Sequence, residues 1–206
     1  MESRIRFLSL NIGMKSNLAG LTNILVNHKI DVVFLQEVKI TDEELESKVA
    51  RFGYKCKVNI NIEDSTKPGT AIAWRSTLLV REVTTLVTCR AQVAFLEEYA
   101  LLNLYAPSGS DKKYERGAFF SQEVFRAFNL HPESKWLVGG DFNCVLKPID
   151  VENGTGFDQK KCPQLNDLIS IKKLKDVYRA VYPLGREFTF FRTCSTFQIG
   201  QVLYSC

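Results

Sequence analysis

Apolar residues near the start of the chain follow two spacings, one typical of strands and one typical of helices. Residues 5–12 form a short apolar run that is rich in β-forming residues and is broken by Gly13. Apolar residues then recur at near-helical spacing up to Ile30. The run Val-Val-Phe-Leu at 32–35 shows no alternation, which predicts a strand buried on both faces. The pattern therefore predicts a strand, a helix and a second strand, in this order.

The next helix is predicted by the residues at its two ends. Thr41 followed three residues later by Glu44 is typical of a helix N-terminus, and Gly53 is typical of a C-terminus. Short β-type runs then continue to residue 105, separated by polar or glycine-containing turns, which favours an antiparallel meander. These runs cover residues 55–62, 70–74, 78–89 and 99–104.

The second half of the chain returns to alternating helices and strands. Helical spacing is found at residues 114–128, and the strand predicted at 135–138 ends abruptly at Gly-Gly-Asp-Phe-Asn. A modest helix is predicted at 162–174. The chain has no internal repeat, low-complexity tract or interdomain linker. These elements predict one mixed α/β domain built in layers.

Composition and charge narrow the classes of protein to be considered. With 206 residues, 45% hydrophobic and 24% charged, the chain suffices for one buried core but is short for two domains. The net charge of +4 permits a polyanionic partner without requiring one. The first residues do not show the basic-then-apolar pattern expected of a signal peptide, and no apolar run approaches the ~18 residues of a membrane span. We therefore expect a soluble intracellular protein.

The cysteines give no sign of a structural metal site. The six cysteines form no Cys-x-x-Cys pair, and the chain has only two histidines to complete a zinc site with them. Reduced thiols in a reducing compartment are the simpler interpretation.

Several polar residues stand at or just beyond the ends of predicted strands. In a layered α/β domain such ends gather at one rim, where ligands usually bind. Each residue alone has an ordinary explanation, because Glu37 could be a solvated strand-end acid and Asn11 a turn former before Gly13. Only the joint occurrence of these residues in this order favours a catalytic site. These residues are Asn11, Glu37, Asn103, Tyr105, Asp141 and Asn143.

The order of these motifs resembles the endonuclease/exonuclease/phosphatase superfamily over about residues 4–192. The phrases most similar to the nuclease domain of LINE-type (non-LTR) retrotransposons are Phe-Leu-Gln-Glu at 34–37, Asn-Leu-Tyr-Ala-Pro at 103–107, Gly-Gly-Asp-Phe-Asn-Cys-Val-Leu at 139–146 and Glu-Phe-Thr-Phe-Phe-Arg at 187–192. The chain also resembles the apurinic/apyrimidinic (exonuclease III-like) endonucleases of DNA repair. The resemblance implies a DNase I-like α/β sandwich, in which two mixed or antiparallel sheets pack together and are flanked by helices.

The resemblance also implies a divalent cation. By position, Glu37 would be the principal ligand of a catalytic Mg²⁺, with Mn²⁺ as an alternative, and Asn11 would lie beside it. Asp141 and Asn143 complete the set of residues expected near the cation. One or two carboxylates with waters and phosphate oxygens suit Mg²⁺. The cation would act as a Lewis acid on the scissile phosphate.

The other residue roles that the resemblance implies concern the substrate, which would be DNA. Asp141 would activate the attacking water as general base, and Asn143 would hydrogen-bond the phosphoryl oxygens as charge builds. Tyr105 would contact the phosphate from the opposite side, and Thr189 would lie near the DNA backbone or a flipped base. The implied reaction is phosphodiester hydrolysis that leaves a 3′ hydroxyl, and its implied location is the nucleus.

The last residues depart from the family pattern. After the phrase at 187–192 the family continues with Ser-Arg-Leu/Ile-Asp-Arg-x-Tyr and a final Ser-Asp-His, whereas this chain reads Ser-Thr-Phe-Gln-Ile-Gly-Gln-Val-Leu-Tyr-Ser-Cys. A one-base shift of a suitable coding string converts this ending into Ser-Arg-Leu-Asp-Arg-Phe-Tyr-Ile-His. Our hypothesis is an incomplete domain at 1–192 and an aberrant, frameshifted tail at 193–206, which sequencing of the locus tests.

Two consequences of this departure are expected. A lost strand would leave a sheet incomplete, with unpaired backbone groups. A lost phosphate-binding histidine would cost roughly 10²–10³ in rate, so we expect little or no nuclease activity from this chain. Neither His28 nor His131 lies at the family position.

Two rival interpretations stay open at this point. The same fold serves phosphatases of inositol lipids, which share the Glu and Asp-x-Asn elements. A non-catalytic remnant that binds nucleic acid or another partner would need no histidine. No membrane association and no stable protein partner are predicted.

Overall fold

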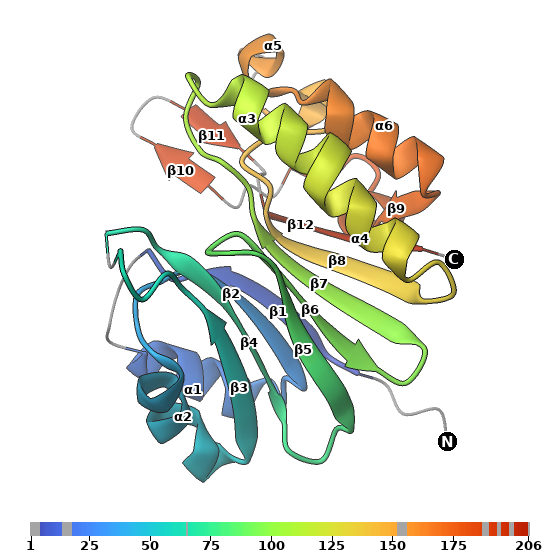
Figure 1. Cartoon of the computed structure of the whole chain (residues 1–206). Helices are drawn as coiled ribbons and strands as arrows, with labels where there is room; N and C mark the ends of the chain where they lie inside the picture. Colours follow the sequence, from blue (N-terminus) through green and yellow to red (C-terminus); the bar gives the residue numbers. More distant parts are fainter. Residues whose placement is uncertain are drawn as a thin grey trace.

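Two β-sheets pack face to face and carry helices on their outer faces (Figure 1). This arrangement comes from a computed structural model that describes residues 5–13, 18–64, 66–151, 156–186, 190–192, 195–197 and 200–205. The predicted layered sandwich is therefore confirmed. Among the described residues, none of the helices has the length and apolar content that crossing a bilayer requires.

The first sheet has four strands in the order β1-β2-β4-β3. β1 and β2 are parallel, and the two other neighbouring pairs are antiparallel. Two helices, α1 and α2, and the short 3-10 helix η1 lie on its outer side. The bounds are β1 Phe7–Asn11, α1 Ala19–Asn27, β2 Val32–Val38, α2 Asp42–Val49, η1 Ala50–Phe52, β3 Tyr54–Asn59 and β4 Gly69–Arg75.

The second sheet has six strands in the order β5-β6-β7-β8-β12-β9. Only the β7–β8 pair is parallel. A separate two-stranded ribbon joins β10 (Phe190–Arg192) to β11 (Ser195–Phe197). The bounds of the six strands are β5 Val80–Val87, β6 Ala91–Leu96, β7 Tyr99–Tyr105, β8 Lys135–Asp141, β9 Leu174–Asp176 and β12 Gly200–Ser205.

The helices of the second half cover the outer face of the six-stranded sheet or connect its strands (Figure 1). α3, the π-helical segment η2 and α4 follow one another without a break and form one long helix. The bounds are α3 Lys113–Ala118, η2 Phe119–Val124, α4 Phe125–Leu130, η3 Pro148–Asp150, α5 Phe157–Lys160, α6 Pro163–Ile171 and α7 Val177–Val181.

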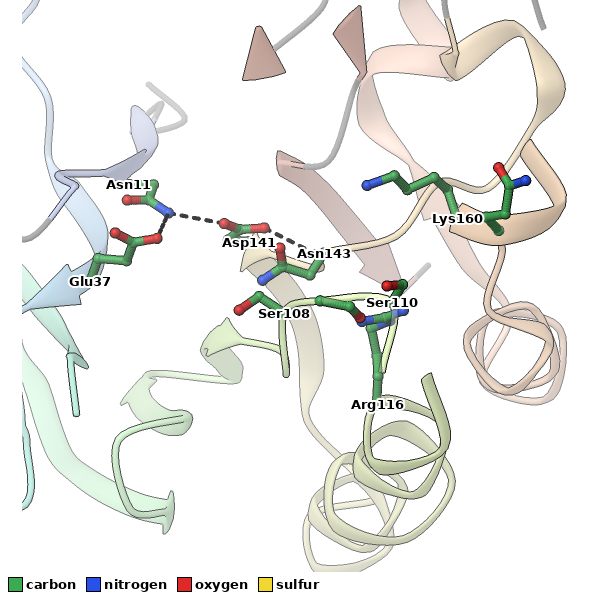
Figure 2. A pocket seen from close by; sticks show the side chains of 10 residues that line it. Asn11, Glu37, Ser108, Ser110, Arg116, Asp141, Asn143 and Lys160 are labelled. Carbon is green, nitrogen blue, oxygen red and sulfur yellow. Dashed lines mark hydrogen bonds between the residues drawn. The ribbon is translucent and has the colours of Figure 1, made fainter. Parts of the chain in front are cut away.

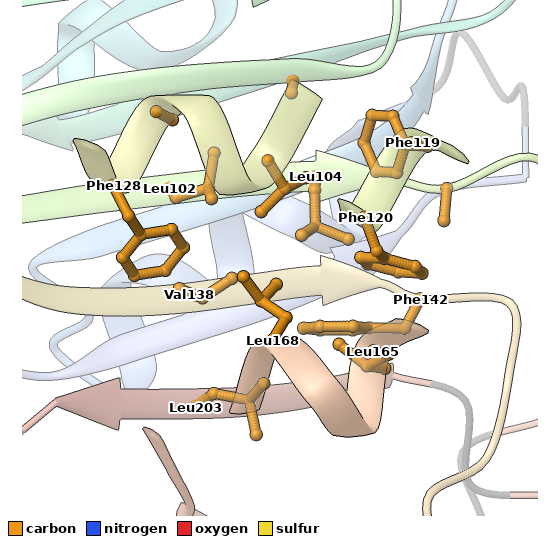
Figure 3. Close-up of a cluster of buried hydrophobic side chains, with 14 of the residues drawn as sticks. Leu102, Leu104, Phe119, Phe120, Phe128, Val138, Phe142, Leu165, Leu168 and Leu203 are labelled. Carbon is orange, nitrogen blue, oxygen red and sulfur yellow. The ribbon is translucent and has the colours of Figure 1, made fainter. Parts of the chain in front are cut away.

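The core has one apolar cluster for each layer contact. The largest cluster joins the long helix and α6 to the outer face of the six-stranded sheet, as Figure 3 shows. In it the ring of Phe142 stacks on that of Phe120, with centroids 6.0 Å apart. Both rings are fully buried, and each such side chain contributes roughly 1.5–3 kcal/mol through burial. Phe142 thereby anchors the chain directly after Asp141, the last residue of β8.

The helix predicted from its two ends is confirmed in detail. Thr41 Oγ1 accepts from the backbone N–H of Glu44, and the Glu44 side chain accepts from the backbone N–H of Thr41. These two hydrogen bonds satisfy backbone donors that the carbonyl groups of the helix cannot satisfy. Gly53 ends η1 with a φ of 78°, in the left-handed region that favours glycine.

The predicted single meander is wrong, because it divides between the two sheets. β3 and β4 form a hairpin of the first sheet, whereas β5, β6 and β7 form a meander of the second. The pattern also missed β6, which is buried along nearly its whole length and so shows no alternation. Its turn into β7 carries Glu97 at a φ of 52°, a position at which the usual signal residues are glycine, asparagine and aspartate.

The expected gap in the sheet is not found. β12 pairs antiparallel with β8 from Gly200 to Tyr204 and with β9 from Leu203 to Ser205. Leu203 is fully buried in the largest cluster. The expectation of an incomplete sheet was wrong because strand pairing uses backbone groups and requires of the side chains only that apolar ones face the core. The frameshift origin of residues 193–206 stays a hypothesis.

Gly140 should be irreplaceable for a backbone reason. Its φ is 141°, and a Cβ built on it would lie 1.9 Å from the carbonyl oxygen of Leu104 on the neighbouring strand. We expect Gly140→Ala to lower the free energy of unfolding by at least about 2–3 kcal/mol, as measured by urea denaturation.

Gly20→Ala is the matched control for this prediction. Gly20 lies in α1, and a Cβ there meets no atom within 4 Å. We expect this variant to be more stable than the wild type by about 0.5–1 kcal/mol. Equal stability of the two alanine variants would contradict the account of the β7–β8 contact.

Candidate active site

The predicted polar residues converge because of the two-residue repeat of β-strands. On β1, Phe7 faces the space between the two sheets, and so Asn11 at the end of the same strand faces it too. On β7 the same repeat leads from Leu101 to Tyr105, and on β8 it leads from Leu137 to Asp141. Three strands from two sheets therefore end with polar side chains in one place.

Glu37 reaches this place through a β-bulge. On β2, Phe34 and Gln36 face the other sheet, so an unbroken strand would turn Glu37 toward α1 and α2. The register with β4 instead shifts between Gln36 and Val38, and Glu37 has a φ of 58°. Val38 then packs on the helix side, which makes Glu37 the extra residue. Bulges and left-handed non-glycine residues gather at functional sites, where the strain is tolerated.

Asn11, Glu37 and Asp141 line one pocket of about 310 Å³ (Figure 2). Tyr105 contacts Glu37 from outside this lining. Its walls come from the ends of β1, β2 and β8, from the loop after β7, and from α3 and α5. The lining residues are Asn11, Glu37, Ser108, Gly109, Ser110, Arg116, Asp141, Asn143, Gln159 and Lys160.

The amide of Asn11 joins two carboxylates across the sheets. Its Nδ2 donates to Glu37 Oε1 at 3.0 Å and to Asp141 Oδ2 at 3.0 Å, as Figure 2 shows. Asn11 Oδ1 accepts from the backbone N–H of Gly13 at 2.9 Å, which fixes the orientation of the amide. The hydroxyl of Tyr105 lies 3.4 Å from Glu37 Oε1 and donates to it.

Asn143 is held beside Asp141 in a constrained backbone conformation. Its φ is 50°, its N–H donates to Asp141 Oδ1 at 3.0 Å, and its Nδ2 donates to the carbonyl oxygen of Ala106 at 2.8 Å. The short Asn side chain tolerates left-handed backbone better than most residues. One amide N–H of Asn143 therefore has its partner in the loop after β7, and the other has none among the residues that the structure describes.

Burial sets the protonation of Asp141. Burial raises the pKa of Asp141 above its ordinary range, the charge of Glu37 adds to this, and hydrogen bonds from Asn11 and Asn143 oppose it. A raised pKa means that the folded chain binds a proton more tightly than the unfolded chain. Ionised Asp141 therefore costs stability at neutral pH, and this cost disappears as the pH falls through the folded pKa.

A layer of buried amides lies directly behind the pocket. Asn103 donates to the backbone carbonyls of Leu35 at 3.0 Å and Ala71 at 2.8 Å, and it accepts from Gln36 Nε2 at 2.8 Å. These bonds link β7 to β2 and β4 of the other sheet. Asn103 was predicted at the rim, but it is fully buried and lies outside the pocket lining. Its place on the inner face makes it a link between the sheets.

Sequence reasoning missed the other half of the pocket. Ser108, Ser110, Arg116 and Lys160 come from a loop and two helices, and their spacing carried no strand-end signal. The available signal was the position of the loop directly after Tyr-Ala-Pro. Thr189 lies outside the described residues, and the roles assigned to the other five predicted residues stay predictions.

The acidic half of the pocket suits a cation with few protein ligands. Among the described residues, no three His, Cys, Asp or Glu side chains gather as a complete metal site. Glu37 and Asp141 nevertheless supply carboxylate oxygens, and a single amide donor now lies between them. Mg²⁺ usually keeps several waters and takes one or two carboxylates together with substrate phosphates. The donor set therefore fits Mg²⁺ and does not fit a closed structural zinc site.

Comparisons with known proteins agree with this geometry. The model of the Endonuclease/Exonuclease/phosphatase family matches residues 8–195. An AP endonuclease from Archaeoglobus fulgidus is 18% identical, with a TM-score of 0.82 over 98% of this chain and 87% of that chain. A 3′ phosphatase, NExo, from Neisseria bound to a product DNA hairpin is 19% identical, with a TM-score of 0.81 over the same shares.

A third solved structure, the 3′-5′ exonuclease NExo from Neisseria meningitidis, is 18% identical, with a TM-score of 0.76 over 98% of this chain and 86% of that chain. At these identities the likeness shows a shared fold.

The hydrogen bond from Asn11 should hold the pKa of Asp141 down. We expect Asn11→Ala to raise the pKa of Asp141 further, because the variant loses a donor to the ionised form and leaves the charge of Glu37 nearby. Carboxyl-carbon NMR titration measures this shift. Asn129→Ala is the control, since Asn129 lies on α4 and bonds Lys172. A pKa of Asp141 that stays unchanged in Asn11→Ala would refute the assignment.

Proposed function

Because the chain belongs to the Endonuclease/Exonuclease/phosphatase family, we propose that it hydrolyses phosphodiester bonds in DNA with the help of a divalent cation. The observation that carries the proposal is the Asn11 amide between the carboxylates of Glu37 and Asp141. The net charge of +4 favours a nucleic acid over an uncharged substrate. The nucleus, where chromosomal DNA lies, is the proposed location.

Glu37 and Asn11 are the residues that would hold the cation, Mg²⁺ or alternatively Mn²⁺. When bound, the cation would supply Lewis-acid polarisation of the scissile phosphate. Tyr105 donates to the Glu37 carboxylate, and Asn11 aligns that carboxylate with Asp141. The bulge at Glu37 keeps this carboxylate at the mouth of the inter-sheet space.

Asp141 is the proposed general base. It is buried, and its raised pKa makes it a better proton acceptor than an exposed aspartate at the same pH. One carboxylate oxygen accepts from Asn11 and the other from the backbone N–H of Asn143, so the group cannot rotate freely. The second amide N–H of Asn143 donates to the phosphoryl oxygens, and the Tyr105 hydroxyl contacts the phosphate from the side of Glu37.

The proposed chemistry uses no histidine from residues 1–206. The two histidines of the chain, His28 and His131, lie at the C-terminal ends of α1 and α4, and neither lines the pocket. A missing charge-stabilising donor typically costs about 10²–10³ in rate. We therefore expect slow turnover.

Nicking of supercoiled plasmid tests the proposed function. We expect slow nicking that requires Mg²⁺ or Mn²⁺, and a further loss of at least about 10²-fold in Asp141→Ala and Glu37→Gln. Glu133→Gln is the charge-matched control, because Glu133 is exposed and lies before β8, at the end of the strand opposite Asp141.

A second assay in the same preparation measures phosphate release from a phosphoinositide. The proposal fails if the wild-type chain leaves plasmid intact and hydrolyses the lipid, or if Asp141→Ala nicks as fast as Glu133→Gln.

A further inference from the structure

The half of the pocket opposite the two carboxylates is basic. Arg116 reaches from α3 to the loop that carries Ser108 and Ser110, and Lys160 extends from α5 across the same side (Figure 2). Both side chains line the pocket that Glu37 and Asp141 line at its other end. The function proposed above assigns no role to Arg116 or Lys160.

Arg116 is a buried cation without an anionic partner in the part of the chain that the structure describes. Its side chain is only 2% exposed, and no described carboxylate forms an ion pair with it. Its Nη1 donates to the carbonyl oxygens of Pro107 at 2.7 Å and Gly109 at 3.1 Å. Its Nε is buried and has no hydrogen-bond partner among the described residues.

The other buried arginine shows what a purely structural guanidinium looks like in this fold. Arg179 forms an ion pair with Asp150, and its Nη1 donates to the carbonyl oxygen of Gly185 at 2.6 Å. Both partners of that pair are buried. An isolated buried charge is strongly destabilising, and an unsatisfied buried donor requires an explanation.

An anion in the pocket would give the charge of Arg116 the partner that it lacks among the described residues. A guanidinium binds phosphate oxygens through two parallel N–H groups, and the donation by Arg116 to two loop carbonyls holds it in one orientation. The exposed hydroxyls of Ser108 and Ser110 supply further donors around the same space, and Lys160 adds a positive charge to its lining. A carboxylate-lined half with a cation and a guanidinium-lined half would together match two phosphate groups.

We propose that the half of the pocket formed by Arg116, Lys160, Ser108 and Ser110 binds a second phosphate group, the phosphodiester next to the scissile one in the same DNA strand. This inference rests on the function proposed above for the nature of the substrate. The test of the second-phosphate site measures binding and needs no turnover. The second-phosphate proposal can therefore fail while the nuclease proposal stands, and the nuclease proposal can fail while the second-phosphate proposal stands.

The test compares nucleotides that differ by one phosphate. The full chain is titrated by calorimetry with thymidine 5′-monophosphate and with thymidine 3′,5′-bisphosphate, in Ca²⁺ in place of Mg²⁺ so that a cation occupies the acidic half while turnover is kept low. We expect the wild-type chain to bind the bisphosphate at least about tenfold more tightly, which is one charge-assisted contact. Arg116→Gln should lose this preference, and Lys160→Gln should reduce it.

Two controls separate binding from folding. Lys161→Gln removes a neighbouring charge that pairs with Asp158 and does not line the pocket, so the preference should be intact. In the wild-type chain, the Nε–H NMR signal that Arg116→Lys removes should shift with the bisphosphate and not with the monophosphate. This measurement requires no change to the protein that binds the ligand.

Three results would overturn the proposal. One is equal binding of the two nucleotides by the wild-type chain. Another is a preference that Arg116→Gln and Lys160→Gln retain in full. The third is binding of inositol 1,4-bisphosphate that is tighter than binding of the thymidine bisphosphate, because the second phosphate would then belong to an inositol substrate.

Discussion

The site depends on one constraint, which is that alternate residues of paired strands face the space between the two sheets. This repeat directs Asn11, Tyr105 and Asp141 to one point from three strands, and the bulge in β2 adds Glu37. The Asn11 amide then holds both carboxylates at 3.0 Å across the sheet boundary. Neither sheet contains this arrangement alone, so the site exists only when the sandwich has formed.

The inner face changes character along its length in a way that supports the site. Near the start of β2 it is apolar, with Phe34 packed between the sheets. Farther along, Gln36 and Asn103 exchange a hydrogen bond at 2.8 Å, and Asn103 reaches two carbonyls of the opposite sheet. A fully satisfied buried network fixes one relative position of its elements. The two sheets are therefore locked against sliding close to the point where their carboxylates must meet.

Part of the fold and of the pocket could be predicted from the sequence. Each element or residue that was missed has a physical reason. The strand ends at Asn11, Glu37 and Asp141 were predictable because an apolar run that stops at a polar residue indicates the end of a buried strand. The basic half of the pocket was not, because Arg116 lies in a helix whose periodicity shows only that it is helical. Strand β6 was missed because its continuous burial leaves little alternation. Strand β12 was misjudged because pairing with β8 depends on backbone groups and does not require the family's side-chain motif.

Crystals of the chain grown with Mn²⁺ and a short DNA duplex test the central claim most directly, through the anomalous signal of the metal. The account predicts one Mn²⁺ peak within coordination distance of the Glu37 carboxylate and next to Asn11, with a DNA phosphate beside Asp141. DNA bound elsewhere on the surface, with no Mn²⁺ peak in the pocket, would contradict it.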